Sequence, residues 1–349
     1  MSVTTKTIAD AAGVSLATVS RVMNKMPGVG EDTAQLVRAT IDRVGYQRPS
    51  VRRGPKPRSH RILQQRFVAL ITAGQDPTPL YKAPVFPSLL VGIERALAAQ
   101  QLRLALIGQG GDDRLSSALN DDRLEGVLMV GPLEETMTPD GRAWLNRLPA
   151  VWLVHEHGNE LGNFDRVVYN NPLVGELAAR HLLNKGHKNL AFLNAMSDHP
   201  GFARRQKVFI DACHAAGANV REFIAPDPRE ATMAAFQKLL SDMARMSPLP
   251  TGLFVPNDRQ LPALYMALAN HRIVPGKDVE IISCDNESLI LDQFHPTPTS
   301  IDLNWGLVGE RGVQQLLWRR KHPDEQSRVT ITIDPFIPSR DPDLSSGVE

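Results

Sequence analysis

Apolar residues follow two different patterns along this chain, and the pattern changes near residue 66. Up to residue 44, apolar side chains recur three or four positions apart, which is the period of an amphipathic helix. From residue 67 onward, short continuous apolar runs alternate with stretches of helical period. Such runs, separated by amphipathic helices, are typical of buried parallel strands. The chain is therefore expected to join a small helical unit to a larger α/β body.

The N-terminal pattern predicts three short helices. Gly13 ends the first one, because glycine tolerates the left-handed conformation that closes many helices. Ser15 stands where an N-cap side chain accepts a hydrogen bond from a backbone N–H, so it opens the second helix. The third helix is expected over residues 31–44. The side chains predicted to form their shared core are Ile8, Ala9, Ala12, Val19, Val22, Ala34, Val37, Ile41 and Val44.

The second helix leaves several side chains outside that core. Two short helices joined by a glycine turn match a helix-turn-helix, whose second helix enters the major groove of DNA. Arg21 can donate two hydrogen bonds to a guanine, and Leu16 and Ala17 can contact a thymine methyl group. The hydroxyls of Thr18 and Ser20 can hold phosphates. An ordinary helical hairpin with a solvated face has the same spacing and stays an alternative at this point.

The α/β body contains a series of predicted strands, with helices expected between them at residues 88–100 and 172–186, for example. Parallel sheets covered on both faces by helices follow from this alternation. The pattern repeats beyond the length of one sheet, which predicts two lobes with a cleft at the carboxyl ends of the strands. The predicted strands lie within residues 67–74, 102–109, 126–132, 150–156, 165–171, 189–195, 251–258 and 279–285.

These patterns divide the chain into a headpiece at residues 1–47, a linker at 48–66, a core at 67–340 and a tail at 341–349. Within the core, the first lobe is expected at about residues 67–165 and 298–328. The second lobe is expected at about residues 166–297 and 329–340.

Charge is distributed unevenly, although the net charge of the whole chain is only +1. Residues 1–66 contain 12 Lys and Arg against 4 Asp and Glu, a balance of +8, so the remainder carries −7. A basic end on an acidic body indicates an anionic partner for that end, with nucleic acid first and a membrane surface second. The N-terminus lacks the apolar stretch of a signal peptide, and no apolar run approaches the ~18 residues of a membrane span, so a cytoplasmic protein is expected.

Motifs for catalysis or metal binding are weak. The stretch GQGGDD at residues 108–113 lacks the third glycine of a dinucleotide-binding turn. HEH at residues 155–157 has the wrong spacing for two ligands on one helix face, and Cys213 and Cys284 have no CxxC partner. We therefore expect no enzyme activity, no cofactor and no metal, and two cysteines that serve as core residues.

Residues 7–24, TIADAAGVSLATVSRVMN, resemble the headpiece of the lac repressor family of bacterial transcription regulators. The resemblance implies that Leu16 and Ala17, which follow the capping Ser15, read bases. It implies base or phosphate contacts for the side chains at the matching positions of the second helix, which are Ser15, Thr18, Ser20, Arg21 and Asn24. Family members usually have a phosphate-contacting serine at the cap of the third helix, where this chain has Gly30.

The linker departs further from that family, whose members usually have a short hinge helix with a leucine that wedges into the minor groove. Prolines at positions 49, 55 and 57 prevent such a helix here. The stretch RRGPKPR instead resembles an AT-hook, so Arg53, Lys56 and Arg58 are expected to bind a narrow minor groove without a wedge. A solvated, self-repelling spacer is the alternative.

Residues 67–340 resemble the effector-binding core of the same family, which is similar to periplasmic sugar-binding proteins. The matching stretches include FPSLLVGIERAL, HLLNKGHKNLAFL, FVPNDRQLPALYMAL, VEIISCDN and PFIPSR. The side chains that this resemblance implies for effector binding include an arginine, an asparagine, an aspartate and a tryptophan. Their hydrogen-bond donors and acceptors and the indole face suit a sugar, although a sugar phosphate, a sugar acid or a purine would also accept an arginine. An ion pair between the lobes for Arg205 and Asp285, and a core role for Trp305, are the alternatives. The residues that the resemblance implies for effector binding are Phe86, Arg205, Asn257, Asp285 and Trp305.

Together these features predict a ligand-responsive transcription regulator, a repressor, that binds a palindromic operator as a homodimer or larger assembly. Whether the effector acts as inducer or corepressor stays open. The alternatives from other classes are a sugar-binding or transport component with an incidental basic tail, and a sugar-modifying α/β enzyme.

Overall fold

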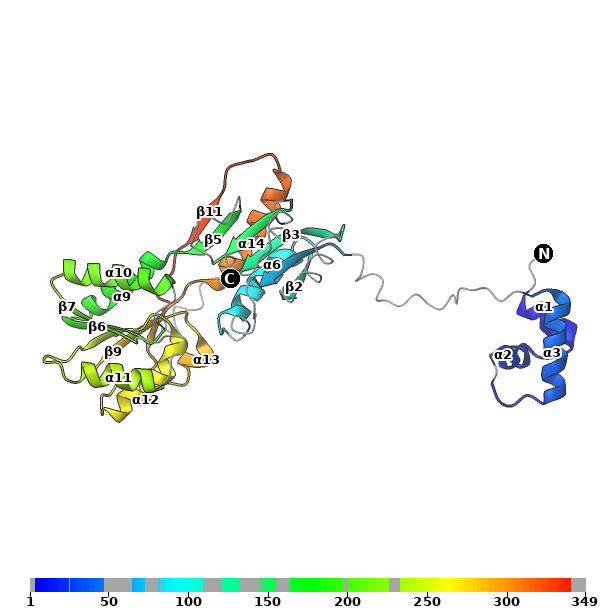
Figure 1. Ribbon diagram of the computed structural model, residues 1–349, viewed down its shortest axis with the longest axis horizontal. Helices are drawn as coiled ribbons and strands as arrows, with labels where there is room; N and C mark the ends of the chain where they lie inside the picture. Colours follow the sequence, from blue (N-terminus) through cyan, green and yellow to red (C-terminus); the bar gives the residue numbers. More distant parts are fainter. Residues whose placement is uncertain are drawn as a thin grey trace. The chain divides into compact units, whose positions relative to one another are not determined.

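The chain forms two compact units in a computed structural model, Met1–Leu63 and Gln64–Glu349 (Figure 1). No helix in the described part of the chain is long and apolar enough to cross a membrane. Most of the linker, the tail, and the GQGGDD and HEH stretches apart from Gly108 lie outside the described residues. The structure describes residues 4–24, 26–46, 65–72, 81, 83–108, 121–131, 145, 147–154, 164–196, 200–225 and 233–339.

The first unit contains the three predicted helices, α1 (Thr5–Ala12), α2 (Leu16–Met23) and α3 (Glu31–Val44). Gly13 ends α1 in the left-handed conformation with φ 64°, as its position predicts. Ser15 caps α2, because its Oγ accepts a hydrogen bond from the backbone N–H of Thr18 at 3.1 Å. The turn between α1 and α2 is therefore determined by two local residues.

The core of this unit agrees with the predicted one except in α3. Ile41 and Val44 are only half-buried there, although both pack against the core. Thr40 is buried instead, because its hydroxyl donates to the carbonyl of Leu36 at 2.8 Å and so satisfies its own polar group. The fully buried side chains of the headpiece core are Ile8, Ala9, Ala12, Val19, Val22, Ala34 and Val37.

The second unit contains two parallel sheets, and every predicted strand region holds a strand. The first sheet has the order β11-β5-β4-β3-β1-β2 and the second has the order β10-β9-β8-β6-β7. The strands of the first sheet are β1 (Phe67–Thr72), β2 (Arg103–Gly108), β3 (Leu124–Val130), β4 (Ala150–Leu153), β5 (Asp165–Tyr169) and β11 (Thr330–Ile333). Those of the second are β6 (Asn189–Asn194), β7 (Asn219–Ile224), β8 (Gly252–Phe254), β9 (Glu280–Cys284) and β10 (Thr299–Ile301).

Helices cover these sheets, as Figure 1 shows. One face of the first sheet packs against α6 and α14, and the two faces of the second pack against α9 with α10 and against α11 with α12. Cys213 and Cys284 are buried and unpaired in the second lobe, as predicted. The helices of this unit are α6 (Phe86–Ala98), α9 (Asn171–Asn184), α10 (Pro200–Ala215), α11 (Met233–Met243), α12 (Leu261–Asn270), α13 (Ser288–Leu291), α14 (Trp305–Lys321) and the 3-10 helix η1 (Asp258–Gln260).

The chain crosses between the lobes at different points from those expected. β11 pairs with β5 in the first sheet, whereas the expected segments assigned β11 and most of β5 to the second lobe. β10 pairs with β9 in the second sheet, whereas it was expected in the first lobe. A strand's own sequence shows that it is buried but not which sheet it joins. Pairing with distant strands decides that, so the boundaries shift by a few residues.

Helices α6 and α14 approach each other closely enough for their backbones to touch. A Cβ atom at Gly92 of α6 would overlap the carbonyl oxygen of Gly306 in α14. One turn further along α14, a Cβ at Gly309 would lie 2.5 Å from the carbonyl oxygen of Leu89. Only glycine permits this distance between two helices, so α14 is held firmly against the first lobe.

This contact predicts opposite effects for two glycine-to-alanine substitutions. Gly92→Ala should destabilise the core by about 2 kcal/mol or more, because the new methyl group overlaps backbone and the helices must separate. Gly306→Ala is the matched control, since its Cβ would lie 3.7 Å from the carbonyl oxygen of Ser88. It should be neutral, or stabilising by up to about 1 kcal/mol, from helix propensity. Thermal denaturation of the full chain measures both, and equal melting temperatures would contradict the proposed contact.

Candidate functional sites

The face of α2 that points away from the headpiece core carries the side chains predicted to contact DNA. Leu16 is 51 % exposed, a high value for a large apolar side chain on a folded unit. Thr18 is half-buried under the N-terminal turn of the helix. The exposed members of this set are Ser15, Leu16, Ala17, Ser20, Arg21 and Asn24.

Local hydrogen bonds occupy some of these groups. The hydroxyls of Ser15 and Thr18 lie 2.9 Å apart, and the Asn24 side chain donates to the carbonyl of Ser20 at 2.9 Å. These bonds hold both ends of α2, so part of the role of Ser15, Thr18 and Asn24 is structural. The guanidinium of Arg21 is exposed and projects from the last turn of the helix. Leu16, Ala17 and Arg21 therefore remain the side chains best placed to reach a ligand.

The structure describes the predicted cap of α3 but not the basic residues predicted to bind DNA in the linker. Gly30 precedes α3 as its N-cap and makes no side-chain hydrogen bond there, which agrees with its sequence. Glu31 and Asp32 occupy the first turn of α3 and suit its helix dipole. Arg53, Lys56 and Arg58 of the linker lie outside the described residues, so their role stays a prediction.

A second candidate site lies at the carboxyl ends of strands from both sheets. Arg205 of α10 is 1 % exposed, and its Nε donates to Oδ1 of Asn171 at 2.6 Å. Its Nη1 donates to the carbonyl of Pro256. The guanidinium carbon lies 5.6 Å from the ring centroid of Tyr169 and 5.4 Å from that of Phe202. These contacts enclose a full positive charge and fix its direction.

Asp285 follows β9 directly and adopts an uncommon backbone conformation with φ 111°. Its neighbour Asn286 has φ 52°, so two successive residues lie in the left-handed region. Burial of the Asp285 carboxyl group raises its pKa well above the usual value, and the nearby Arg205 opposes this rise. The residue as a whole keeps some solvent exposure. A partly enclosed carboxyl group beside an arginine can accept or donate hydrogen bonds.

Two polar atoms at this site have no hydrogen-bond partner among the described residues. They are Oδ1 of Asn257, which follows β8, and Nε1 of Trp305, which opens α14. Leaving a buried polar group unpaired costs about 1–3 kcal/mol, so a stable fold normally pairs it. The acceptor on Asn257 and the donor on Trp305 can therefore bind a ligand or a water molecule. Trp305 also packs at 5.4 Å against Tyr169, which provides an aromatic surface.

Phe86 lies in a different environment from the other predicted ligand residues. It opens α6, is 4 % exposed and packs in the core of the first lobe, 5.4 Å from the Tyr81 ring. Its described contacts are those of a core side chain, and a ligand contact for it stays a prediction. Sequence reasoning missed Tyr169, Asn171 and Phe202, although the first two stand at the end of a predicted strand where site residues are common.

The second site thus brings Trp305 and Tyr169 of the first lobe together with Arg205 of the second. Its donors, acceptors and aromatic rings can hold a small polar ring with hydroxyl groups. Among the described residues no group of three or more His, Cys, Asp or Glu side chains could hold a metal ion. The arrangement suits recognition of a polar ligand.

Comparison with known proteins assigns both parts of the chain. Residues 4–49 match the model of bacterial regulatory proteins of the lacI family, and residues 179–338 match the periplasmic binding protein-like domain. The ribose operon repressor of Escherichia coli (strain K12) is 28 % identical over 344 residues, which cover 94 % of this chain and 97 % of that protein.

Solved structures share the complete architecture. The transcriptional regulator CelR in complex with cellobiose aligns with a TM-score of 0.64 and 20 % identity, over 97 % of this chain and 98 % of that one. The lac repressor dimer bound to operator and the anti-inducer ONPF aligns with a TM-score of 0.58 and 18 % identity, over 96 % and 98 %. The chain thus joins a DNA-binding domain of the lacI family of bacterial regulatory proteins to a periplasmic binding protein-like domain.

Proposed function

We propose that this regulator is a cytoplasmic, non-enzymatic repressor that binds a palindromic operator and responds to a sugar or sugar derivative. The proposal that the chain binds DNA rests on the exposed face of α2, where Leu16, Ala17 and Arg21 make no core contact. A helix of this size fits the major groove, and its N-terminal residues lead into it. Arg21 would donate two hydrogen bonds to a guanine or a phosphate, while Leu16 and Ala17 would contact base edges.

A second copy of the chain is needed, because one headpiece buries too little surface for useful specificity. The first lobe supports this requirement with exposed apolar side chains on neighbouring elements. Val91 on α6 is 54 % exposed, and Leu106 on the edge strand β2 is 51 % exposed. Uncovered edge strands with apolar side chains favour pairing with another chain. A two-fold dimer would present two α2 helices to the two halves of a palindrome.

The ligand-binding half rests on the side chains around Arg205. Asn257 and Trp305 offer an acceptor and a donor that have no partner within the described part of the chain. Arg205 and Asp285 offer ionisable hydrogen-bonding groups. Pyranose and furanose rings match such sets, since hydroxyls both donate and accept and an indole covers the apolar ring face. The similar proteins include a ribose operon repressor and a regulator complexed with cellobiose, which supports a sugar here too.

The DNA-binding half is tested with a duplex selected by the full chain from a randomised pool. Arg21→Ala should weaken binding to that duplex by about 1–3 kcal/mol and reduce discrimination against a scrambled duplex, because a base-reading contact is lost. Arg38→Ala is the matched control, since Arg38 is equally exposed but lies on α3 beside Glu31. Titration by fluorescence anisotropy measures both. Unchanged discrimination by Arg21→Ala would contradict the assignment of α2 as the recognition helix.

The ligand-binding half is tested by a thermal-shift screen of sugars, sugar phosphates, sugar acids and purines. A ligand at about 100 times its Kd should stabilise the core by ~2.7 kcal/mol, because it binds only the folded state. Asp285→Asn and Trp305→Ala should each reduce the shift, whereas Asp292→Asn, exposed at the end of α13, should keep it. A ligand whose shift survives in both site variants would bind elsewhere and overturn this assignment.

A further inference from the structure

Arginines lie at the N-terminal ends of the strands in the first sheet, which together form one edge of that sheet. Its strands are all parallel, so their N-terminal ends lie on the same edge, as the register of Phe67 opposite Arg103 and of Thr330 opposite Arg166 confirms. An arginine occurs within three residues of the start of every strand in this sheet. These arginines are Arg66, Arg103, Arg123, Arg147, Arg166 and Arg328.

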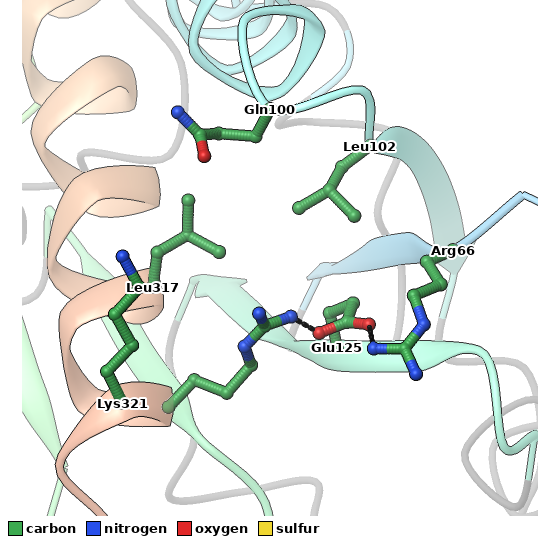
Figure 2. A pocket seen from close by; sticks show the side chains of 7 residues that line it. Arg66, Gln100, Leu102, Glu125, Leu317 and Lys321 are labelled. Atoms are coloured by element: carbon green, nitrogen blue, oxygen red, sulfur yellow. Dashed lines mark hydrogen bonds and ion pairs between the residues drawn. The ribbon is translucent and has the colours of Figure 1, made fainter.

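The last turn of α14 adds Arg319, Arg320 and Lys321 beside the same strand ends. Arg320 and Arg66 both form ion pairs with Glu125, which lies at the start of β3. A hollow of about 180 Å³ opens here. Figure 2 shows Gln100 and Leu102 on one side of it and Leu317 and Lys321 on the other. We call these strand ends together with the last turn of α14 the basic edge.

Glu125 positions cations rather than neutralising them completely. Its side chain is only 4 % exposed, whereas that of Arg66 is 65 % exposed. One buried carboxylate therefore holds two guanidiniums from the inside, while exposed N–H groups can still reach a ligand. A guanidinium presents five donors in a planar fork, so one bond to Glu125 leaves others available.

Two further acids form ion pairs with arginines of the basic edge. Asp121 pairs with Arg123, and the buried Asp165 pairs with Arg319. Arg166 and Arg328 lie close together, and burial together with Arg328 lowers the pKa of the Arg166 guanidinium. Residues 67–349 carry a net charge of −7 as a whole, so this concentration of arginines stands out against an acidic body.

Stabilisation of the fold explains the presence of only some of the cations on the basic edge. Cations in the last turn of α14 complement the negative end of its helix dipole. Parallel strands have only small net dipoles, so the arginines that precede the strands gain little from the same effect. Exposed arginines collected along one edge instead match a polyanion, since guanidiniums bind phosphates in bidentate fashion.

We propose that the basic edge is a second DNA-contacting surface, located on the core itself, that binds backbone phosphates of the duplex flanking the half-site read by α2. This inference rests on the proposed function. The linker enters the core at this edge, because Gln65 and Arg66 directly precede β1. The chain from Tyr46 to Gln65 spans at most roughly 65 Å when fully extended, which sets an upper limit on the distance between the headpiece and the basic edge.

The basic edge lies at the opposite end of the first lobe from the ligand site. α14 begins at Trp305, in the ligand site, and ends at Lys321, on the basic edge. β5 likewise starts beside Arg166 and ends at Tyr169. DNA contact and ligand contact therefore use opposite ends of the same rigid elements and do not compete for side chains.

The test compares two duplexes that both contain the selected operator, one of minimal length and one extended on each side by arbitrary sequence of about 15 base pairs, one and a half helical turns. The edge variant carries Arg103→Gln, Lys321→Gln and Arg328→Gln, three exposed cations of the basic edge. The matched control carries Lys188→Gln, Lys238→Gln and Lys277→Gln, three exposed cations of the second lobe. Equal melting temperatures of the three full-length proteins establish that all are folded.

For the unchanged protein and the control, the extended duplex should bind about tenfold more tightly than the minimal one. The edge variant should lose this gain, and the slope of log K against log[salt] should fall by about two to three, because each phosphate contact contributes ~0.9. All three proteins should bind the minimal duplex equally. No gain from the flanks in the unchanged protein, or an equal gain in the edge variant, would overturn the proposal. The proposal would also be overturned if the flanks had no effect on DNA binding and only an acidic protein or heparin competed for the basic edge. Failure of the unchanged protein to prefer the selected duplex over a scrambled one would instead contradict the proposed function.

Discussion

The backbone contact between α6 and α14 at Gly92 and Gly306 is the constraint on which the first lobe depends. It holds α14 against the lobe at its N-terminal turn, which carries Trp305 into the ligand site. The other end of α14 reaches the strand ends where the linker joins the core. A displacement of Trp305 by a ligand would therefore move a rigid element rather than a loop, because a helix packed without side chains between the backbones cannot yield locally.

Strand direction separates the candidate ligand site of the core from its basic edge. The carboxyl ends of the strands carry Tyr169, Asn257 and Asp285. The backbone of Asp285 is strained, and Oδ1 of Asn257 has no hydrogen-bond partner among the described residues. The N-terminal ends of the first sheet carry arginines, some of them held by buried carboxylates. Parallel sheets place ligand sites at the carboxyl ends as a rule. The opposite edge of the first lobe is then left for the proposed DNA contact, beside the point where the linker joins the core.

Much of this architecture follows from local sequence. Gly13, Ser15 and the apolar stripe of α2 determine the turn and the exposed face, so the helix-turn-helix is predictable from a short stretch. The long apolar strands are equally clear. β7 was missed because it is an exposed edge strand whose apolar pattern is interrupted by Arg221 and Glu222. β10 and β11 were missed because they have only three and four residues. The lobe boundaries depend on pairings between distant strands, such as β11 with β5, which no local pattern contains.

The ligand site was predictable only in part for the same reason. Arg205, Asn257, Asp285 and Trp305 carry chemistry that a family resemblance identifies. Tyr169, Asn171 and Phe202 enter the site because they enclose Arg205, and a contact of this kind exists only after folding. Conversely, Phe86 matches a pocket position by sequence but packs into the core of the first lobe.

We expect ligand binding around Arg205 and DNA binding by α2 to be energetically coupled through the first lobe. The most direct test is the operator affinity of the full chain, measured with and without a saturating ligand, together with the ligand affinity with and without operator. The two affinities should change by the same factor, between about 5 and 150, because coupling between sites is reciprocal. A ligand that binds this site and leaves the operator affinity unchanged would contradict it.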